Sequence, residues 1–155
     1  MDTHGSLIGI ARGPRHGAPM ELLSEVRVST RSGVEGENRG RELSQVTILA
    51  DSPWKAACAE VGKDLPWTTR RANLLLTGVE LQNTRGATLK IGEVVLEITD
   101  ELAPCHVMDI LCGGLRKALT PQWRGGVSCR VLAGGILRLG DPVTLVLSSA
   151  SSAPV

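Results

Sequence analysis

The amino-acid sequence predicts a mainly β fold: a closed or partly closed β-barrel with a few short helices packed on it. Apolar residues recur with the period of a β-strand, or in short β-branched runs, in eight separate places along the chain. Only two segments carry a helical pattern instead. The chain has three Trp and neither Phe nor Tyr, so its core is expected to consist of Val, Leu and Ile. Many short strands in one chain are typical of a closed β structure.

The eight predicted strands follow one another at short intervals, and glycine-containing turns join the last ones. Paired glycines and a Gly-Asp-Pro sequence mark those final turns, because these residues favour tight reversals of the chain. The predicted strands are Leu7–Arg12, Glu25–Ser29, Gln45–Ala50, Leu74–Thr77, Thr88–Ile91, Val94–Thr99, Val127–Leu132 and Pro142–Leu147.

The two helical segments are expected to pack against the barrel. The first covers residues 52–61, where Asp51 or Ser52 can cap the helix and Pro53 suits the first helical position. The second runs from Pro104 to about residue 119. A glycine pair at 113–114 interrupts it, which predicts two short helices or a bend.

A chain of 155 residues is expected to form one domain, here residues 1–147. Residues 148–155, S-S-A-S-S-A-P-V, are expected to be a disordered tail. The longest segment without periodicity, residues 30–44, contains three glycines among charges of both signs. Long loops of this kind are either functional or simply solvated, and composition alone leaves both readings open.

Charge and hydropathy exclude several classes of partner. The formal net charge is +1, which argues against nucleic acid, and the chain lacks the aromatic platforms on which single-stranded bases stack. No apolar run approaches the ~18 residues of a membrane span, and the N-terminus does not have the pattern of a signal peptide. We therefore expect a cytoplasmic protein that binds neither nucleic acid nor membrane.

Cys105 is the most distinctive candidate for chemistry. It follows Pro104 where a strand pattern gives way to a helix pattern, and unpaired N–H groups at a helix start favour thiolate over thiol. A soft thiolate there suits a metal such as molybdenum, or persulfide chemistry. A buried cysteine acting as a small hydrophobe is the alternative. For the other three cysteines, a core position is favoured: Cys58, Cys112 and Cys129.

A second candidate group lies directly before a predicted buried strand. Arg70, Arg71 and Asn73 place guanidinium donors and an amide at a strand end, which suits a phosphate and the edge of a heterocycle. Surface ion pairs of the two arginines explain the pattern equally well.

The order and spacing of several short motifs resemble the molybdenum cofactor sulfurase C-terminal, or MOSC, domain over nearly the whole chain. The motifs are G-V-E-G-E at 33–37, S-Q-V-T-I-L at 44–49, R-R-A-N-L-L-L-T-G-V-E-L at 70–81, G-A-T-L-K-I-G at 86–92, Pro104-Cys105, R-G-G-V-S-C-R-V at 124–131 and G-G-I-L-R-L-G-D-P-V at 134–143. The chain is similar to stand-alone bacterial members. The resemblance implies a mostly β, barrel-like fold.

The resemblance also implies roles for individual residues. Cys105 matches the family cysteine that is proposed to ligate molybdenum or to carry sulfur. Arg71 and Asn73 match the Arg-x-Asn motif that in amidoxime-reducing relatives helps to hold the pterin and its phosphate. Gly33, Gly36 and Glu37 match a Gly-x-x-Gly-Asp loop, except that Glu37 replaces the Asp and the histidines common beyond it are missing. Pyridoxal phosphate belongs to the partner domain of the sulfurases, and this chain shows no such domain.

Three functions from different classes remain open on the sequence. An enzyme would hold a molybdenum–molybdopterin cofactor through Cys105 and reduce N-hydroxylated compounds, with a separate flavin or iron–sulfur protein as electron donor. A carrier would hold sulfur as a Cys105 persulfide, supplied by a cysteine desulfurase, or would hold the cofactor for delivery elsewhere. A plain structural or interaction domain would use none of these groups.

Overall fold

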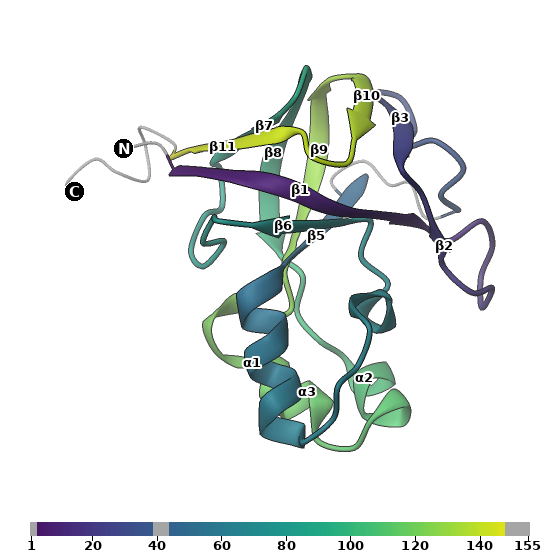
Figure 1. Ribbon diagram of the computed structural model, residues 1–155, viewed down its shortest axis with the longest axis vertical. Helices are drawn as coiled ribbons and strands as arrows, with labels where there is room; N and C mark the ends of the chain where they lie inside the picture. The colour runs from purple at the N-terminus through teal and green to yellow at the C-terminus, as the bar shows by residue number, and fades with distance from the viewer. Residues whose placement is uncertain (1–2, 39–43, 148–155) are drawn as a thin grey trace.

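The computed structural model describes residues 3–38 and 44–147, and within these residues a seven-strand sheet closes on itself as a barrel (Figure 1). The ring closes because the last strand pairs antiparallel with the first. Its members, in the order in which they pair, are β1 (Thr3–Arg12), β6 (Leu74–Thr77), β5 (Val46–Ala50), β9 (Val127–Ala133), β8 (Val94–Glu101), β7 (Thr88–Ile91) and β11 (Pro142–Val146).

Short strands extend this barrel at its periphery. A second sheet contains β10 (Gly135–Arg138), β3 (Glu25–Ser29) and β4 (Gly33–Val34), and β2 (Glu21–Leu22) pairs with the end of β1. The sequence pattern predicts β3 but misses β2, β4 and β10. Strands β2 and β4 have two residues each, too few to show an alternation of apolar and polar residues, and β10 begins within the paired glycines that predict a turn.

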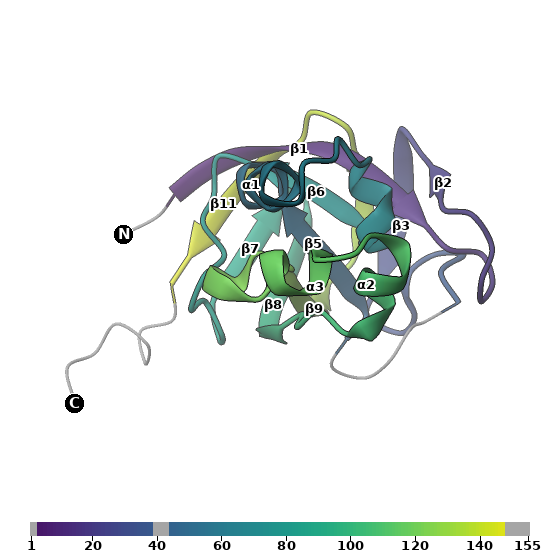
Figure 2. The same ribbon diagram turned by 90° about the horizontal axis from the view of Figure 1, so that it is seen from below.

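Three short α-helices gather at one end of the barrel, as Figures 1 and 2 show: α1 (Asp51–Val61), α2 (His106–Leu111) and α3 (Leu115–Leu119). Two 3₁₀ helices, η1 (Trp67–Arg70) and η2 (Pro121–Trp123), lie in the connections. The interruption predicted at residues 113–114 is confirmed, because Gly114 adopts the left-handed conformation with φ of 89° between α2 and α3.

The predicted cap of the first helix is wrong. Ala50 is the N-cap residue and makes no side-chain cap, and Asp51 already lies inside the helix. Strand β5 runs directly into α1, so no residue is left between them to act as a polar cap. Asp51 instead contributes a negative charge to the first turn and pairs with Lys55 at 3.1 Å.

The apolar residues form two clusters. The larger fills the barrel with Val, Leu and Ile side chains from every strand of the ring, as the composition predicts. The smaller lies between the helices and the outer face of the barrel, and includes Leu49, Trp54, Leu75 and Leu115. Among the described residues, no helix is both long and apolar enough to cross a bilayer. The predicted tail, residues 148–155, lies outside the described residues, as do residues 39–43 of the predicted loop.

Candidate functional site

The segment between η1 and β6 is anchored at its start by Arg70. Only 8% of Arg70 is exposed, and its guanidinium donates from Nε to the carbonyl oxygen of Gly125 at 3.0 Å and from Nη2 to that of Leu102 at 2.6 Å. Two chain segments far away in sequence are therefore fixed to η1 by one side chain. Buried guanidinium groups require such partners because desolvating a charge is costly.

Arg71 follows η1 in the left-handed conformation, with φ of 61° and ψ of 32°. Glycine is the usual residue there, because a Cβ atom makes this conformation unfavourable. Arg71 is half-buried, and its Nη2 lies 3.0 Å from the point where a Cβ atom on Gly13 would be. The guanidinium thus packs against the end of β1, beside Gly13.

Asn73 lies just before β6 and only 1% of it is exposed. Its Oδ1 accepts from the backbone N–H of Thr47 at 3.1 Å and from the Thr47 hydroxyl at 3.2 Å. Its Nδ2 donates to the carbonyl oxygen of Ala11 at 3.2 Å and to Oε1 of Glu37 at 2.8 Å. One side chain therefore joins β1, β5 and the loop at residues 33–37, which we call the glycine loop.

The glycine loop reaches this point through a tight turn over residues 34–37. The N–H of Glu37 donates to the carbonyl oxygen of Val34 at 3.1 Å, and Gly36 has a φ of 84° that suits the third position of such a turn. A Cβ atom on Gly36 would lie 2.7 Å from Nη1 of Arg12, so the turn packs tightly against the end of β1. Glu37 in turn accepts from the N–H of Gly13 at 2.9 Å.

Cys105 is exposed and is the N-cap residue of α2, with φ of −121° and ψ of −177°. The sequence places it in the first helical turn, and this detail is wrong because the helix begins at His106. Its carbonyl oxygen accepts from the N–H of Met108 at 3.0 Å, and its thiol makes no cap. The loop that carries it contains Leu102, to which Arg70 donates.

The other cysteines differ from Cys105 in burial. Cys58 and Cys129 are buried and Cys112 is half-buried, so the predicted core positions hold fully for the first two and in part for the third. Burial raises the pKa of the Cys129 thiol far above its ordinary value, and the nearby Glu97 carboxylate adds to the effect. Cys129 is therefore a neutral thiol at physiological pH.

Metal ligands do not gather in the part of the chain that the structure describes. In residues 3–38 and 44–147, no three or more His, Cys, Asp or Glu side chains lie together as a metal site would require.

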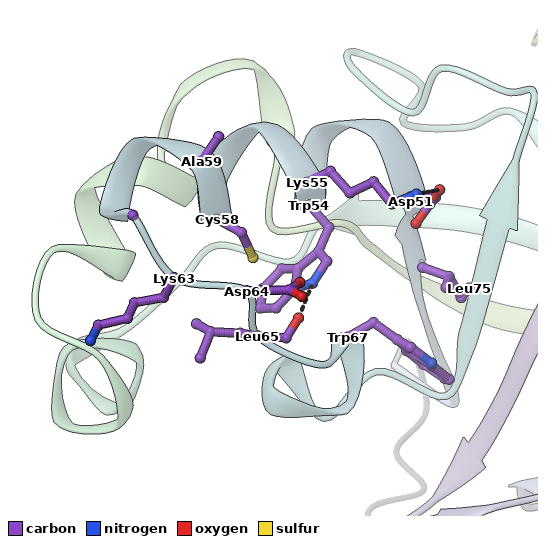
Figure 3. A pocket seen from close by; sticks show the side chains of 11 residues that line it. Asp51, Trp54, Lys55, Cys58, Ala59, Lys63, Asp64, Leu65, Trp67 and Leu75 are labelled. Atoms are coloured by element: carbon purple, nitrogen blue, oxygen red, sulfur yellow. Dashed lines mark hydrogen bonds and ion pairs between the residues drawn. The ribbon is translucent and has the colours of Figure 1, made fainter.

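One surface pocket of about 510 Å³ lies between α1, η1 and the connection that joins them (Figure 3). Trp54 and Trp67 line it, and Trp54 donates from Nε1 to the carbonyl oxygen of Leu65 at 3.2 Å. The Cys58 thiol lies beside Trp54 in Figure 3. The pocket includes none of the residues predicted to bind a cofactor.

The structure brings some of the predicted residues together. Glu37 contacts Asn73 directly, and Arg71 lies beside Gly13, which Glu37 also contacts. Arg70 points elsewhere, toward the segment before Cys105. Whether these residues bind a cofactor stays a prediction. The sequence reasoning missed Gly13 and Thr47. Gly13 before a proline indicates a turn, but nothing in the sequence shows that its backbone N–H meets Glu37.

A comparison with family models finds a match to the MOSC domain over residues 35–144, which is more than half of the chain. The chain belongs to the MOSC domain family. This family is associated with binding of the molybdenum cofactor. Among curated proteins, no match is found.

Solved structures show the same fold at low sequence identity. The YUAD protein from Bacillus subtilis superposes with a TM-score of 0.81 at 14% identity, covering 96% of this chain and 99% of that one. YiiM from Geobacillus stearothermophilus gives 0.68 at 19% identity, covering 94% and 73%. YiiM from Escherichia coli gives 0.71 at 15% identity, covering 92% and 70%. These three structures share the overall fold of this chain.

Proposed function

We propose that this MOSC protein binds a molybdenum–molybdopterin cofactor, with the Cys105 thiolate as the protein ligand of the metal. Arg71 supplies the charge that pairs with the phosphate of the pterin, since a guanidinium recognises phosphate through parallel N–H donors. With an external electron donor, the loaded protein reduces N-hydroxylated compounds. A separate flavin or iron–sulfur protein would supply the electrons.

The observation that carries this proposal is the connection made by Arg70. Its guanidinium donates to the carbonyl oxygen of Leu102, three residues before Cys105, and Arg71 is the next residue along the chain. The same guanidinium donates to Gly125, beside which Pro104 also packs. The exposed thiol and the half-buried Arg71 therefore belong to segments that one buried side chain holds in register.

The residues present fit a cofactor of this kind. A bare metal ion would need several protein ligands, and the described residues offer no such cluster. A metal that arrives on an organic dithiolene ligand needs one soft donor from the protein, and an exposed thiol is such a donor. When bound, the group supplies two-electron oxygen-atom chemistry. The chain supplies the thiolate, the anion contact and a fixed loop.

Metal analysis of the purified protein tests the proposal. The protein is expressed in a host that makes the cofactor, and molybdenum is measured per chain for the wild type and for Cys105→Ser. We expect near-stoichiometric molybdenum in the wild type and its loss in the variant. Cys112→Ser is the matched control, because this half-buried cysteine lies seven residues away at the C-terminal end of α2. Wild-type protein without molybdenum, or a serine variant that retains it, would contradict the proposal.

A sulfur carrier is the second candidate, and the exposure of Cys105 favours it. A thiolate on the surface can attack the persulfide of a cysteine desulfurase, which transfers the outer sulfur to Cys105 and releases the donor's thiolate. Mass spectrometry after incubation with a desulfurase and cysteine separates the two functions. A carrier gains 32 Da (about the mass of one sulfur atom) at Cys105 and holds no molybdenum.

A further inference from the structure

We infer that Asn73 and Glu37 are positioning residues, which together latch the glycine loop to the end of β1 and do not themselves touch the bound anion. The inference rests on the proposed site, because it assigns the roles of residues around Arg71. It departs from the role that the family resemblance implies for Asn73. It also explains why Glu37 of the glycine loop contacts Asn73, which lies just before β6.

The amide of Asn73 has no capacity left for a ligand. Its backbone partners determine which atom of the amide is oxygen and which is nitrogen. The N–H of Thr47 can only donate, so it faces Oδ1, and the carbonyl oxygen of Ala11 can only accept, so it faces Nδ2. The Thr47 hydroxyl and Glu37 take the remaining positions. With 1% of the residue exposed, a cofactor could reach this amide only by displacing part of the barrel.

Glu37 connects this buried amide to the surface. Its Oε1 accepts both from Nδ2 of Asn73 at 2.8 Å and from the N–H of Gly13 at 2.9 Å. Hydrogen bonds to an ionised carboxylate are stronger than neutral ones. The loop backbone adds a further contact to the same place, where the N–H of Asn38 donates to the carbonyl oxygen of Gly13 at 3.0 Å.

The latch lies directly beside Arg71. A Cβ atom on Gly13 would lie 3.0 Å from Nη2 of Arg71 and 3.6 Å from Oε2 of Glu37, so the guanidinium and the carboxylate approach the same point. Movement of the loop would change what surrounds the guanidinium. The latch thus fixes the surroundings of Arg71, the residue that we propose binds the anion.

Two variants of Glu37 separate its geometry from its charge. Glu37→Gln keeps an acceptor oxygen for both hydrogen bonds and loses the negative charge, whereas Glu37→Ala loses both. Glu37 is half-buried, so both proteins should fold. Glu35→Ala is the matched control on the same loop, since the exposed Glu35 carboxylate pairs only distantly with Arg27, at 3.9 Å.

Two measurements are made on each protein by NMR: hydrogen exchange of the Gly13 amide, and affinity for inorganic phosphate. We expect Glu37→Ala to raise the exchange rate and weaken phosphate binding, each by about tenfold or more, because it removes both hydrogen bonds of the latch. Glu37→Gln should bind phosphate as tightly as the wild type or more tightly, because it keeps the hydrogen bonds and removes a negative charge beside Arg71. Glu35→Ala should bind phosphate as the wild type does, because it leaves the latch intact.

A double-mutant cycle with Asn73→Ala tests whether the two residues act together. The alanine removes the donor to Glu37 without placing a second carboxylate beside it. If both residues act through the latch, Glu37→Ala will weaken phosphate binding little further in this background. Additive losses would show that Asn73 contacts the anion by itself and would overturn the inference. Unchanged phosphate affinity in Glu37→Ala would overturn it too, and so would a wild-type protein that binds no phosphate. Absence of molybdenum from the wild type contradicts the proposed cofactor alone, because neither NMR measurement requires the metal.

Discussion

At the scale of single residues, burial separates the four cysteines more sharply than sequence position does. Cys105 is exposed at a helix N-cap, whereas Cys129 lies wholly inside the barrel with a pKa raised by burial. Thiolate, not thiol, is the nucleophile and the metal ligand. Of these two thiols, only Cys105 has the accessibility that either proposed function requires.

This difference predicts the pattern of alkylation in the native protein. Cys105 should react with iodoacetamide at least about tenfold faster than Cys58 or Cys129, because a reagent cannot reach a buried thiol without local opening. Peptide mass spectrometry over a time course measures the three rates. Cys105→Ser should change the free energy of unfolding by less than about 0.5 kcal/mol, while Cys129→Ala should cost about 1–2 kcal/mol. Equal alkylation rates would contradict the functional assignment of Cys105.

Arg71 shows a second residue-scale effect, a conformation that its side chain does not favour. A non-glycine residue with a φ of 61° costs about 1 kcal/mol. Strained positions often mark functional sites. We therefore expect the Arg71 side chain to be retained for binding as well as for its contacts within the chain.

Arg71→Gly should accordingly raise the free energy of unfolding by about 1 kcal/mol while lowering the molybdenum content of the purified protein. Urea denaturation and metal analysis of the same preparation provide the two readings. Arg71→Lys retains both the strain and a positive charge, and should match the wild type in stability while holding phosphate less well. If Arg71→Gly is less stable than the wild type, the arginine has a structural role instead.

At the scale of elements, Arg70 joins η1 to two connections, one directly after β8 and one directly before β9. Its two carbonyl partners, Leu102 and Gly125, lie 32 and 55 residues away. Each of these segments is a connection without regular structure of its own at the point of contact. One planar group with several donors holds them at fixed spacing, which a single ammonium group could not do.

Arg70→Lys should therefore cost about 1–3 kcal/mol in the free energy of unfolding, since a buried carbonyl oxygen loses its partner. Amide exchange should increase in the segment from Leu102 to Cys105. Exchange mass spectrometry resolves this segment from the barrel strands, which should stay protected. Arg116→Lys, at an exposed position on α3, serves as the control and should leave both quantities unchanged. Unaltered exchange before Cys105 would show that Arg70 does not hold this loop.

At the scale of the whole molecule, the barrel depends on contact between its two ends in sequence. Strand β11 pairs with β1 on one side and β7 on the other, and Leu145 lies opposite Thr3 and Leu89 in these pairings. Only 3% of Leu145 is exposed. The side chain thus fills the barrel at the point where the ring closes.

Leu145→Ala should cost about 2–5 kcal/mol by leaving a cavity in the core. Leu147→Ala is the matched control two residues further on, where 41% of the residue is exposed and the cost should stay below about 1 kcal/mol. Thermal unfolding followed by circular dichroism compares the two. Equal losses would show that the closing strand is not part of the cooperative core.

The main elements could be predicted from the sequence because their information is local. Strand-period alternation or short apolar runs located all seven strands of the barrel, and the glycine pair at 113–114 correctly divided the second helical segment. The N-cap of α1 was mispredicted, because Asp51 has the right chemistry for a cap but β5 leads straight into the helix. Strands of two residues such as β4 have no period to detect.

What the sequence alone determined is the class of fold, the family resemblance and the set of chemically interesting residues, since all three depend on residue type and order. Only the tertiary structure decided which of those residues meet. It turned Arg70 toward Leu102 and Gly125, buried Asn73 against Thr47 and brought Glu37 onto Gly13. These contacts join residues 24 to 55 positions apart. Such pairings follow from how the sheet closes, and no local pattern in the chain encodes that closure.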